Sequence, residues 1–402
     1  MSFRPLAGLT VLDLTSVVVG PVCTARLANY GADILKLESP EGDLMRGLGG
    51  QSPAGQHSGT YLHLNRGKRN ICCDLKKPGA DAILKRLVGK ADIIIANMRP
   101  AALKRLGLDH ETILAAHPEK IYCLITGYGS DGPYAGYPTY DSVIQAASGI
   151  PGLMAMRDGT PAYAPLVMCD HIVGEMAAGA VLAAVTEKFR SGVGTFIEVP
   201  MFETMACFVL QEHLAQHSFD PPVGPAGDQR LLSPHNRPVQ TKDGWVSFTV
   251  NTDKQVQAFL DATGRTALKE DPRFATVRSR ADNVRLWFEI RGAPLLERTT
   301  DEWLELFRAA DIAAMPCNDV ESLRNDPHLN AVGMFGHEDH PVEGATVTIR
   351  SPLLFNGKAE TASGYSQPKG WDSAAIGREL GCDENEVAAL QASGAILSHP
   401  HH

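Results

Sequence analysis

The chain has 402 residues, which predicts two domains or one large α/β unit. Hydrophobic residues make up 44% of it and charged residues 21%, a balance typical of globular proteins that excludes a disordered or fibrous chain. Lys and Arg number 37 against 46 Asp and Glu, so the net charge is −9. This charge disfavours nucleic acid and anionic membrane surfaces as main partners.

The sequence also predicts where in the cell the protein is located. No apolar run approaches the roughly 20 residues that cross a bilayer, and the first residues lack the pattern of a secretory signal. We therefore expect a soluble, cytoplasmic protein without a membrane partner. The eight cysteines have neither zinc-ribbon nor CxxC spacing, so we expect reduced thiols and no metal.

The first half of the chain alternates short β-branched runs with helical stretches, the pattern of βαβ units around a parallel sheet. Buried strands are predicted over residues 9–19, 33–37, 91–96, 121–126 and 195–199. Helices are predicted over residues 24–30, 80–88, 101–106, 140–147 and 171–189. The fold class is thus predicted to be α/β, with a large doubly wound, Rossmann-like domain.

The second half predicts a smaller α/β domain. A helix over residues 202–217 is followed by a Pro- and Gly-rich stretch typical of a linker, then by a strand, a turn and a strand within 239–250. The C-terminus is expected to return to the large domain and to end in a helix near residues 384–391. The predicted limits are 1–219 and 331–402 for the large domain, 239–315 for the small one, and 220–238 and 316–330 for linkers.

One glycine motif invites a nucleotide-binding interpretation. Residues 127–132 match GxGxxG after a strand, but Pro133 follows and no helix opens there to face a pyrophosphate. A loop is therefore favoured, which argues against a dinucleotide-dependent oxidoreductase. The sequence also contains no Walker A motif and no GxSxG elbow.

Asp170 is the residue that we single out as a candidate for chemistry. It stands between a loop and the apolar helix predicted over residues 171–189. The commonest role of Asp at such a place is an N-cap, and the residue alone favours that interpretation. A nucleophile is equally compatible with the position, because a helix N-terminus favours the ionised carboxylate that nucleophilic attack requires.

Ordered motifs along the first 200 residues resemble class III CoA-transferases, the family of formyl-CoA transferase and carnitine CoA-transferase. The motifs occupy residues 5–15, 20–21, 27–33, 36–40, 65–69, 74–76, 97–100, 106–109, 127–133 and 140–146, and a weaker likeness recurs at 380–390. Many motifs in the same order are far more specific than any one of them.

The resemblance implies that Asp170 is a catalytic nucleophile. It would attack the thioester carbonyl of an acyl-CoA, giving a mixed anhydride and CoA thiolate. The thiolate would then attack the aspartyl carbonyl, the donor acid would leave, and an acceptor carboxylate would finally receive CoA. CoA and acyl-CoA are thus implied as substrates, together with a small carboxylic acid, and no permanently bound cofactor or metal is needed.

The same resemblance implies contacts with CoA, and the residues that match the family's CoA-binding segments are Val17, Val18, Leu75, Asn97, Met98 and Arg105. Two positions depart from the pattern: Ser39 stands where some relatives have a phosphate-binding arginine, and Pro138 lies near a position that can be basic. Compensating charge is expected from Lys68, Arg69 and Lys77, unless these form a solvated basic face.

Substrate and assembly follow from the resemblance as further expectations. His235 and Arg237 would suit a second carboxylate, which favours a dicarboxylate such as succinate, with Tyr140 and Asp141 also near the substrate. Residues 140–145 lack the histidine of the related acyl-CoA racemases, which disfavours a racemase or epimerase. That activity stays an alternative, beside a non-catalytic CoA-binding protein. The family's crossing linkers imply an interlocked homodimer.

Overall fold

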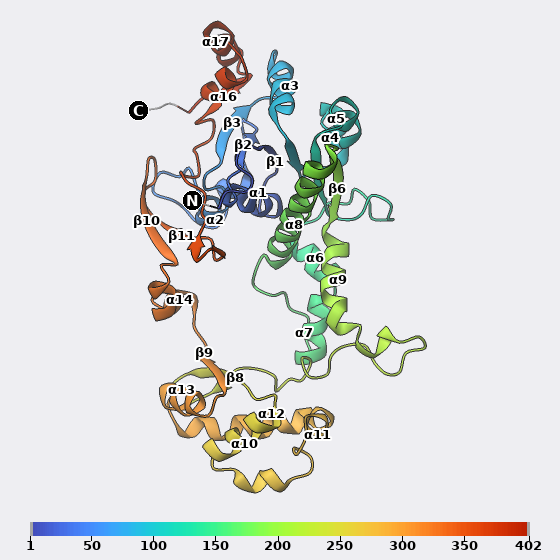
Figure 1. Cartoon of the computed structure of the whole chain (residues 1–402), viewed down its shortest axis with the longest axis vertical. Coiled ribbons are helices and arrows are strands. Elements are labelled where there is room, and N and C mark those ends of the chain that lie inside the picture. The colour runs from blue at the N-terminus through green and yellow to red at the C-terminus, as the bar shows by residue number, and fades with distance from the viewer. Residues whose placement is uncertain (1–2, 400–402) are drawn as a thin grey trace. The chain divides into compact units, whose positions relative to one another are not determined.

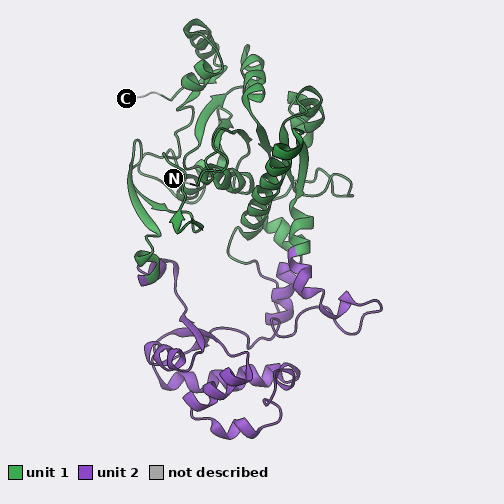
Figure 2. Ribbon diagram, viewed as in Figure 1, with its two compact units in different colours: residues 1–148, 164–207, 328–402 green, residues 149–163, 208–327 purple. Residues whose placement is uncertain are grey.

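The structure is a computed structural model that describes residues 3–399. The chain divides into two compact units, coloured green and purple in Figure 2. Unit 1 comprises residues 1–148, 164–207 and 328–402, and unit 2 comprises residues 149–163 and 208–327. Unit 2 therefore contains the whole predicted small domain, and the predicted linkers remain predictions.

A seven-stranded sheet forms the centre of unit 1 (Figure 1). Its order is β14-β3-β2-β1-β4-β5-β6, and every pairing is parallel except that of β14 with β3. The order reverses between β1 and β4, which is where doubly wound sheets bind their ligands. The strands are β1 (Thr10–Leu14), β2 (Asp33–Glu38), β3 (Arg69–Cys73), β4 (Ile93–Ala96), β5 (Ile121–Thr126), β6 (Thr195–Pro200) and β14 (Ile396–Leu397).

Helices cover this sheet because the strands are apolar on both faces. Helices α1 and α8 pack against each other and against the sheet, while α3, α4, α5, α16 and α17 contribute to one hydrophobic cluster with it. The helices of unit 1 are α1 (Val19–Asn29), α2 (Gly59–Leu64), α3 (Ala80–Lys90), α4 (Pro100–Leu106), α5 (His110–Ala116), α6 (Asp141–Ala147), α8 (Met168–Ser191), α16 (Ser373–Glu379) and α17 (Glu384–Ala392).

The remaining elements are short or lie in unit 2. Unit 1 also holds β10 (Phe335–His340), β11 (Gly344–Ile349), β12 (Leu354–Phe355) and β13 (Lys358–Ala359), while α9 (Met201–His213) and α15 (Pro327–Ala331) span the unit limits. Unit 2 holds α7 (Ile150–Asp158), β7 (Val239–Gln240), β8 (Trp245–Thr249), α10 (Asp253–Ala262), α11 (Val277–Asp282), α12 (Val284–Gly292), α13 (Thr300–Ala309), β9 (Ala313–Pro316) and α14 (Val320–Arg324). Its three strands form one antiparallel sheet on an aromatic core.

The first predicted strand is shorter than its apolar run. The strand predicted over residues 9–19 ends at Leu14, and Val19 already begins α1. Asp13 Oδ1 accepts hydrogen bonds from the Thr15 amide at 2.9 Å and from its hydroxyl at 2.5 Å, which turns the chain away from the sheet. Residues 15–18 thus form a connection that we call the β1–α1 loop.

A glycine brings α8 close to α1. A Cβ at position 174 would lie 2.6 Å from the Val19 carbonyl oxygen and 2.7 Å from the Cβ of Val22. Glycine is therefore required for the two helices to approach at this point. The contact places the second turn of α8, one turn after Asp170, against the first turn of α1.

Helix α8 also has the length and apolar composition of a membrane span, the one helix among residues 3–399 that does. Half of its apolar window is buried by the rest of the protein. This burial fits the core helix of a soluble protein.

Candidate active site

A cavity of about 720 Å³ opens at the carboxyl ends of the central strands in unit 1. Its lining residues follow β1, β2, β3 and β4, and they are Leu14, Thr15, Ser16, Leu37, Glu38, Ser39, Pro40, Glu41, Gly42, Asp43, Cys73, Asp74, Leu75, Lys76, Met98, Arg105, Leu106 and Leu108. Open α/β sheets bind ligands at this edge, beside the point where the strand order reverses.

Three of the six residues predicted to contact CoA line this cavity. Leu75, Met98 and Arg105 line it, as does Ser39. Asn97 instead holds the β1–α1 loop, because its amide accepts from the Ser16 N–H at 3.0 Å and donates to the Ser16 carbonyl at 2.9 Å.

Val17 and Val18 continue that loop without lining the cavity. Val17 takes a φ of 69°, a left-handed conformation that costs a β-branched residue about 1–3 kcal/mol. Val18 is buried and precedes the first residue of α1. Strain of this kind persists only where surrounding contacts impose it.

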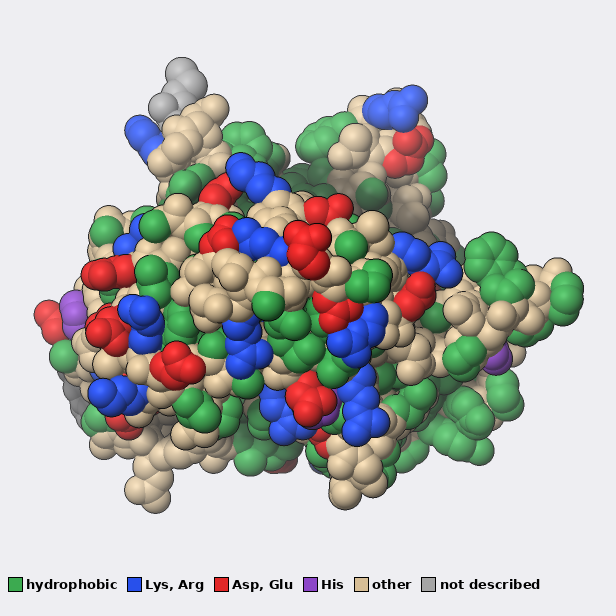
Figure 3. Space-filling model, turned by 90° about the horizontal axis from the view of Figure 1, so that it is seen from below, with side chains coloured by type: hydrophobic (Ala, Val, Ile, Leu, Met, Phe, Trp, Pro, Cys, Tyr) green, Lys and Arg blue, Asp and Glu red, His purple; other side chains and the backbone are tan. Residues whose placement is uncertain are grey.

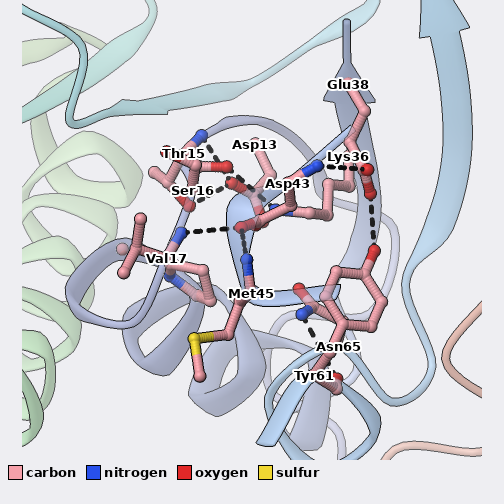
Figure 4. A network of polar contacts seen from close by, with 12 residues as sticks. Asp13, Thr15, Ser16, Val17, Lys36, Glu38, Asp43, Met45, Tyr61 and Asn65 are labelled. Carbon is pink, nitrogen blue, oxygen red and sulfur yellow. Dashed lines mark hydrogen bonds and ion pairs between the residues drawn. The ribbon is translucent and has the colours of Figure 1, made fainter. Parts of the chain in front are cut away.

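Those contacts come from a network of buried charged groups (Figure 4). Asp43 Oδ1 accepts from the Val17 N–H at 3.0 Å and from the Met45 N–H at 2.9 Å, while its other oxygen lies 3.0 Å from Lys36 Nζ. Lys36 Nζ also donates to the Thr15 carbonyl at 2.8 Å. The loop is therefore fixed by side chains from β2 and from the segment that follows it.

Two of the acidic residues at the cavity, Glu38 and Asp43, have basic partners. Arg46 binds both carboxylate oxygens of Glu38 at 2.8 Å, and the Tyr61 hydroxyl donates to Glu38 at 2.5 Å. Burial disfavours the charged form of Glu38, but Arg46 outweighs this and lowers its pKa to about 2. Glu38 is thus an ionised structural carboxylate.

Lys68 and Arg69, two of the three basic residues proposed to compensate for Ser39, are paired with acidic residues away from the cavity, which corrects that part of the sequence interpretation. The third, Lys77, is exposed and does not line the cavity. Lys68 is buried, and its Nζ bonds Thr24 at 2.7 Å and Asp13 at 3.3 Å. Burial lowers its pKa to about 8. Arg69 is occupied by Asp33 and Glu379. The basic residues that line the cavity are Lys76 and Arg105.

Asp170 is the third residue of α8 and is only 7% exposed. It is not the N-cap: Val167 holds that position without a side-chain bond. The cap comes from Asp141 of α6, whose Oδ1 accepts from the N–H groups of Cys169 at 2.7 Å and Asp170 at 3.2 Å. The Asp170 side chain is therefore free of the role that its sequence position first suggested.

Asp141 is itself held in place by Gln145, whose Nε2 donates to Asp141 Oδ2 at 2.6 Å and to the Leu166 carbonyl at 3.0 Å. The same amide accepts from the Ala164 N–H at 3.0 Å. Gln145 thus ties α6 to the segment that leads into α8.

Electrostatics set Asp170 apart from the other buried carboxylates. Burial, and secondly the negative charge of Asp141, raise its pKa from 3.8 to about 7. The helix dipole does not keep it fully ionised, contrary to the sequence-based expectation. A buried carboxyl that titrates near neutrality is a candidate for chemistry.

Three residues beside Asp170 or Asp141 in the sequence differ in their exposure to solvent. Cys169 is buried and its thiol pKa is raised to about 12, first by burial, so it packs and does not react as a thiolate. His171 is exposed. Tyr140 precedes α6 and is 64% exposed.

His235 and Arg237 lie in unit 2, on the segment before β7. Arg237 lines a second cavity of about 630 Å³ together with Arg157, Asp158, Pro234, Asn236 and Pro238. The proximity of Arg237 helps to lower the pKa of Asp158, after the larger effect of the Arg157 hydrogen bond. A role for His235 and Arg237 in substrate binding stays a prediction.

Sequence reasoning missed Lys36 and Asp43, which fix the β1–α1 loop at the cavity. Lys36 lies inside an apolar strand and is fully buried, so the one signal was a charge at a core position. Asp43 resembled an ordinary loop residue. Within residues 3–399, no cluster of three or more His, Cys, Asp or Glu side chains could hold a metal ion.

Comparison with known proteins identifies the family. Residues 6–373 match the model of CoA-transferase family III. A succinate–glutarate CoA-transferase of Agrobacterium fabrum is 32% identical over 373 residues, 90% of this chain and 92% of the relative. A succinyl-CoA:glutarate CoA-transferase of Homo sapiens is 28% identical over 410 residues, 100% of this chain and 92% of the relative.

Solved structures agree as well. A crystal structure of the protein Rv3272 from Mycobacterium tuberculosis matches with a TM-score of 0.80 at 27% identity, covering 93% of this chain and 99% of that one. A CAIB/BAIF family protein from Brucella suis matches with a TM-score of 0.79 at 28% identity, covering 94% of this chain and 100% of that one. The resemblance seen in the sequence motifs is confirmed: the chain belongs to CoA-transferase family III and is a CoA-transferase.

Proposed function

We propose that this CoA-transferase works through a covalent intermediate on Asp170. The observation that carries the proposal is a buried carboxyl group whose pKa is raised to about 7 and whose oxygens, among the described residues, accept no hydrogen bond. A carboxylate without hydrogen-bond donors keeps its lone pairs available for attack on a carbonyl carbon. One turn after Asp170, Gly174 contacts the first turn of α1, and the β1–α1 loop that leads into α1 begins with two residues that line the main cavity.

The reaction then proceeds in balanced steps. The ionised Asp170 carboxylate attacks the acyl-CoA carbonyl, the C–S bond breaks, and CoA thiolate leaves a mixed anhydride behind. The thiolate attacks the aspartyl carbonyl and releases the donor carboxylate, which leaves an aspartyl-CoA thioester. An acceptor carboxylate repeats the two steps in reverse, so that CoA leaves on the acceptor and Asp170 is regenerated.

Asp141 acts in this proposal as a positioning residue. It satisfies two backbone N–H groups of the first turn of α8, and it thereby fixes the turn that carries Asp170. Its charge also disfavours ionisation of Asp170, which keeps the carboxylate basic enough to attack a thioester.

Trapping the intermediate tests the mechanism. The protein is incubated with succinyl-CoA without an acceptor acid, then treated with hydroxylamine and analysed by peptide mass spectrometry. We expect one modified peptide that carries Asp170 as its hydroxamate, and loss of turnover. Recovery of unmodified Asp170 alongside active turnover would contradict the covalent mechanism.

Dicarboxylic acids are the proposed substrate class. Relatives named for succinate, glutarate and succinyl-CoA support this choice, as does the exposed guanidinium of Arg237. We predict that Arg237→Ala raises KM for succinate about ten- to hundredfold, because a charged hydrogen bond contributes roughly 1.5–3 kcal/mol. Butyrate is the matched monocarboxylate control, and an equal rise in its KM would show that Arg237 is structural.

A second experiment separates the racemase alternative from the proposed transfer. An enzyme that moves the α-proton of an acyl-CoA exchanges it with solvent. A transferase restricted to the Asp170 route incorporates no deuterium at the α-carbon in D₂O. Incorporation at the rate of turnover would favour the racemase.

The proposed homodimer rests on exposed area. The chain exposes 21098 Å², whereas two separate compact bodies of the sizes of units 1 and 2 would expose about 18,000 Å² together. Large apolar side chains contribute to the excess, among them Met176 at 53% and Phe189 at 73% exposed on α8. Light scattering at micromolar concentration tests it, and a monomer would overturn the proposed assembly.

The proposed partners are small acids and CoA thioesters in the cytoplasm. On the face shown in Figure 3, lysine and arginine side chains are interspersed with aspartate and glutamate. Nucleic-acid-binding proteins instead gather positive charge on one face. The mixed surface and the net charge of −9 both support small-molecule substrates.

A further inference from the structure

The β1–α1 loop poses a conformational problem at Val17. Its φ of 69° lies in the left-handed region, which suits glycine and which a β-branched residue leaves when nothing holds it there. The loop begins with Thr15 and Ser16, which line the cavity, and ends where α1 contacts α8. Its shape therefore decides the part of the cavity wall that Thr15 and Ser16 form.

Side chains from outside the loop hold its successive backbone groups. The Thr15 carbonyl accepts from Lys36, both Ser16 backbone groups bond Asn97, and the Val17 N–H donates to Asp43. Figure 4 shows Asp43 between Val17 and Lys36, with Met45 on the same carboxylate. Asp43 is 5% exposed and Lys36 is fully buried, so water cannot replace these contacts without opening the core.

The Lys36–Asp43 ion pair does more than neutralise Lys36. The charge of Lys36 is also compensated by Asp13 and Glu38, which together with Asp43 raise its pKa against the effect of burial. What Asp43 alone supplies is the acceptor for the strained Val17 amide. Its own N–H donates to Glu38 Oε2 at 2.8 Å. Arg46 binds the same oxygen, and Tyr61 donates to the other oxygen of Glu38.

We propose that Asp43 is a positioning residue for acyl-CoA binding, which acts by holding Val17 in its left-handed conformation with the support of Lys36. The proposal rests on the proposed function in one respect, the binding of CoA in the cavity of about 720 Å³. It adds a residue that controls the shape of the cavity wall through the backbone of the β1–α1 loop.

Calorimetric titration with CoA and steady-state kinetics with succinyl-CoA and a saturating acceptor test the proposal. We expect Asp43→Ala to raise the Kd for CoA and the KM for succinyl-CoA about ten- to hundredfold, with kcat lowered less than about threefold. Asp43→Asn retains an oxygen acceptor for the Val17 N–H, so it should restore the Kd to within about threefold of the wild-type value.

A second variant, Val17→Gly, distinguishes an effect through the β1–α1 loop from a general loss of stability. Glycine occupies the left-handed region at no steric cost, so in a Val17→Gly protein the change Asp43→Ala should raise the Kd for CoA less than about threefold. Glu343→Gln is the matched control, because Glu343 is buried to the same degree, accepts from Ala54 N–H at 2.8 Å, and lies outside the cavity. It should lower Tm and leave the Kd for CoA unchanged.

The outcomes distinguish the two proposals. If the wild-type protein does not bind CoA, the proposed function fails. If it binds CoA and folded Asp43→Ala protein binds it equally well, the positioning role is wrong. An equal loss in the wild-type and Val17→Gly backgrounds would also overturn it, because Asp43 would then act by another route.

Discussion

Two groups of buried carboxylates in unit 1 differ in what surrounds them. Around the main cavity, Glu38 is bound by Arg46 and Asp43 lies 3.0 Å from Lys36. At the start of α8, Asp170 faces another carboxylate, Asp141, and its pKa is raised to about 7 while that of Glu38 is lowered to about 2. Burial is the largest effect on both groups, so partners decide the difference.

The difference distinguishes carboxylates that stabilise the fold from one that is available to react. A carboxylate that accepts several charged hydrogen bonds is a poor nucleophile, because attack requires that those bonds break. An unpartnered buried carboxylate destabilises the fold and is ready to react. Under the proposed mechanism the same residue type serves two purposes within unit 1, and substitutions can disrupt each purpose separately.

The largest expected effect concerns the unpartnered carboxylate. Asp170→Asn should lower kcat at least about a thousandfold, since the amide keeps the shape but is no nucleophile. The cap of α8 survives because Asp141 provides it. CoA titration and circular dichroism check that the variant still binds and folds. Substantial CoA transfer by a folded Asp170→Asn protein would contradict the proposed mechanism.

Removing the partner of a buried carboxylate should lower the free energy of unfolding. Arg46→Met leaves Glu38 buried without its counter-charge, and we expect a loss of about 3–5 kcal/mol in the free energy of unfolding, measured in urea. Arg69→Met is the matched control, because Arg69 pairs with the exposed Asp33 and Glu379 and should cost about 0–1 kcal/mol. An equal loss of unfolding free energy in both variants would mean that the burial of the Arg46–Glu38 pair does not increase its contribution to stability.

Sequence patterns predicted the strands that are apolar throughout and missed those that are not. Residues 121–126 were predicted and observed as β5 because every inward side chain is apolar or aromatic. Strand β3 begins with Arg69 and Asn70, which bind Asp33 and Glu38 across the sheet, so no local hydrophobic run marks it. Its partner β14 has only two residues and depends entirely on that long-range pairing.

The site shows the same division. Family motifs pointed to Asp170, but nothing local indicated that Asp141, which lies 28 positions before Cys169, would cap α8. That contact depends on the packing of α6 against α8. The Lys36 and Asp43 pair was equally hidden, because two charges seven residues apart are ordinary on a surface and become informative only when both are buried.

A smaller effect should appear as a gain in stability. The folded-state pKa of Asp170 lies above its unfolded value of 3.8, so ionisation destabilises the fold progressively from about pH 4 to pH 7. Asp170→Asn removes this cost, which a rise from 3.8 to about 7 limits to about 4 kcal/mol. We expect a gain of about 2 kcal/mol at pH 8 and none at pH 4, measured by urea unfolding. A loss at pH 8 would show that the ionised carboxylate has a partner.

The smallest effect is a shift in pH dependence. Only ionised Asp170 attacks, so kcat/KM should fall about tenfold per pH unit below a midpoint near pH 7 and level off above it. Asp141→Asn removes the second cause of the raised pKa and should move the midpoint to lower pH by less than about one unit. A midpoint that rises, or stays fixed, would show that the charge of Asp141 does not reach Asp170.

Strand β14 has a consequence for how the protein is made. It pairs with β3 at the edge of the sheet, and α16 and α17 complete the hydrophobic cluster over α3, so residues near the end of the chain close a core that began near residue 12. During synthesis the ribosome releases these last segments only after unit 2 has emerged. Until then β3 presents an unpaired edge, which is prone to aggregation. A nonsense mutation or proteolytic cut between residues 372 and 396 would leave strands β1 to β6 intact in sequence and β3 open at that edge.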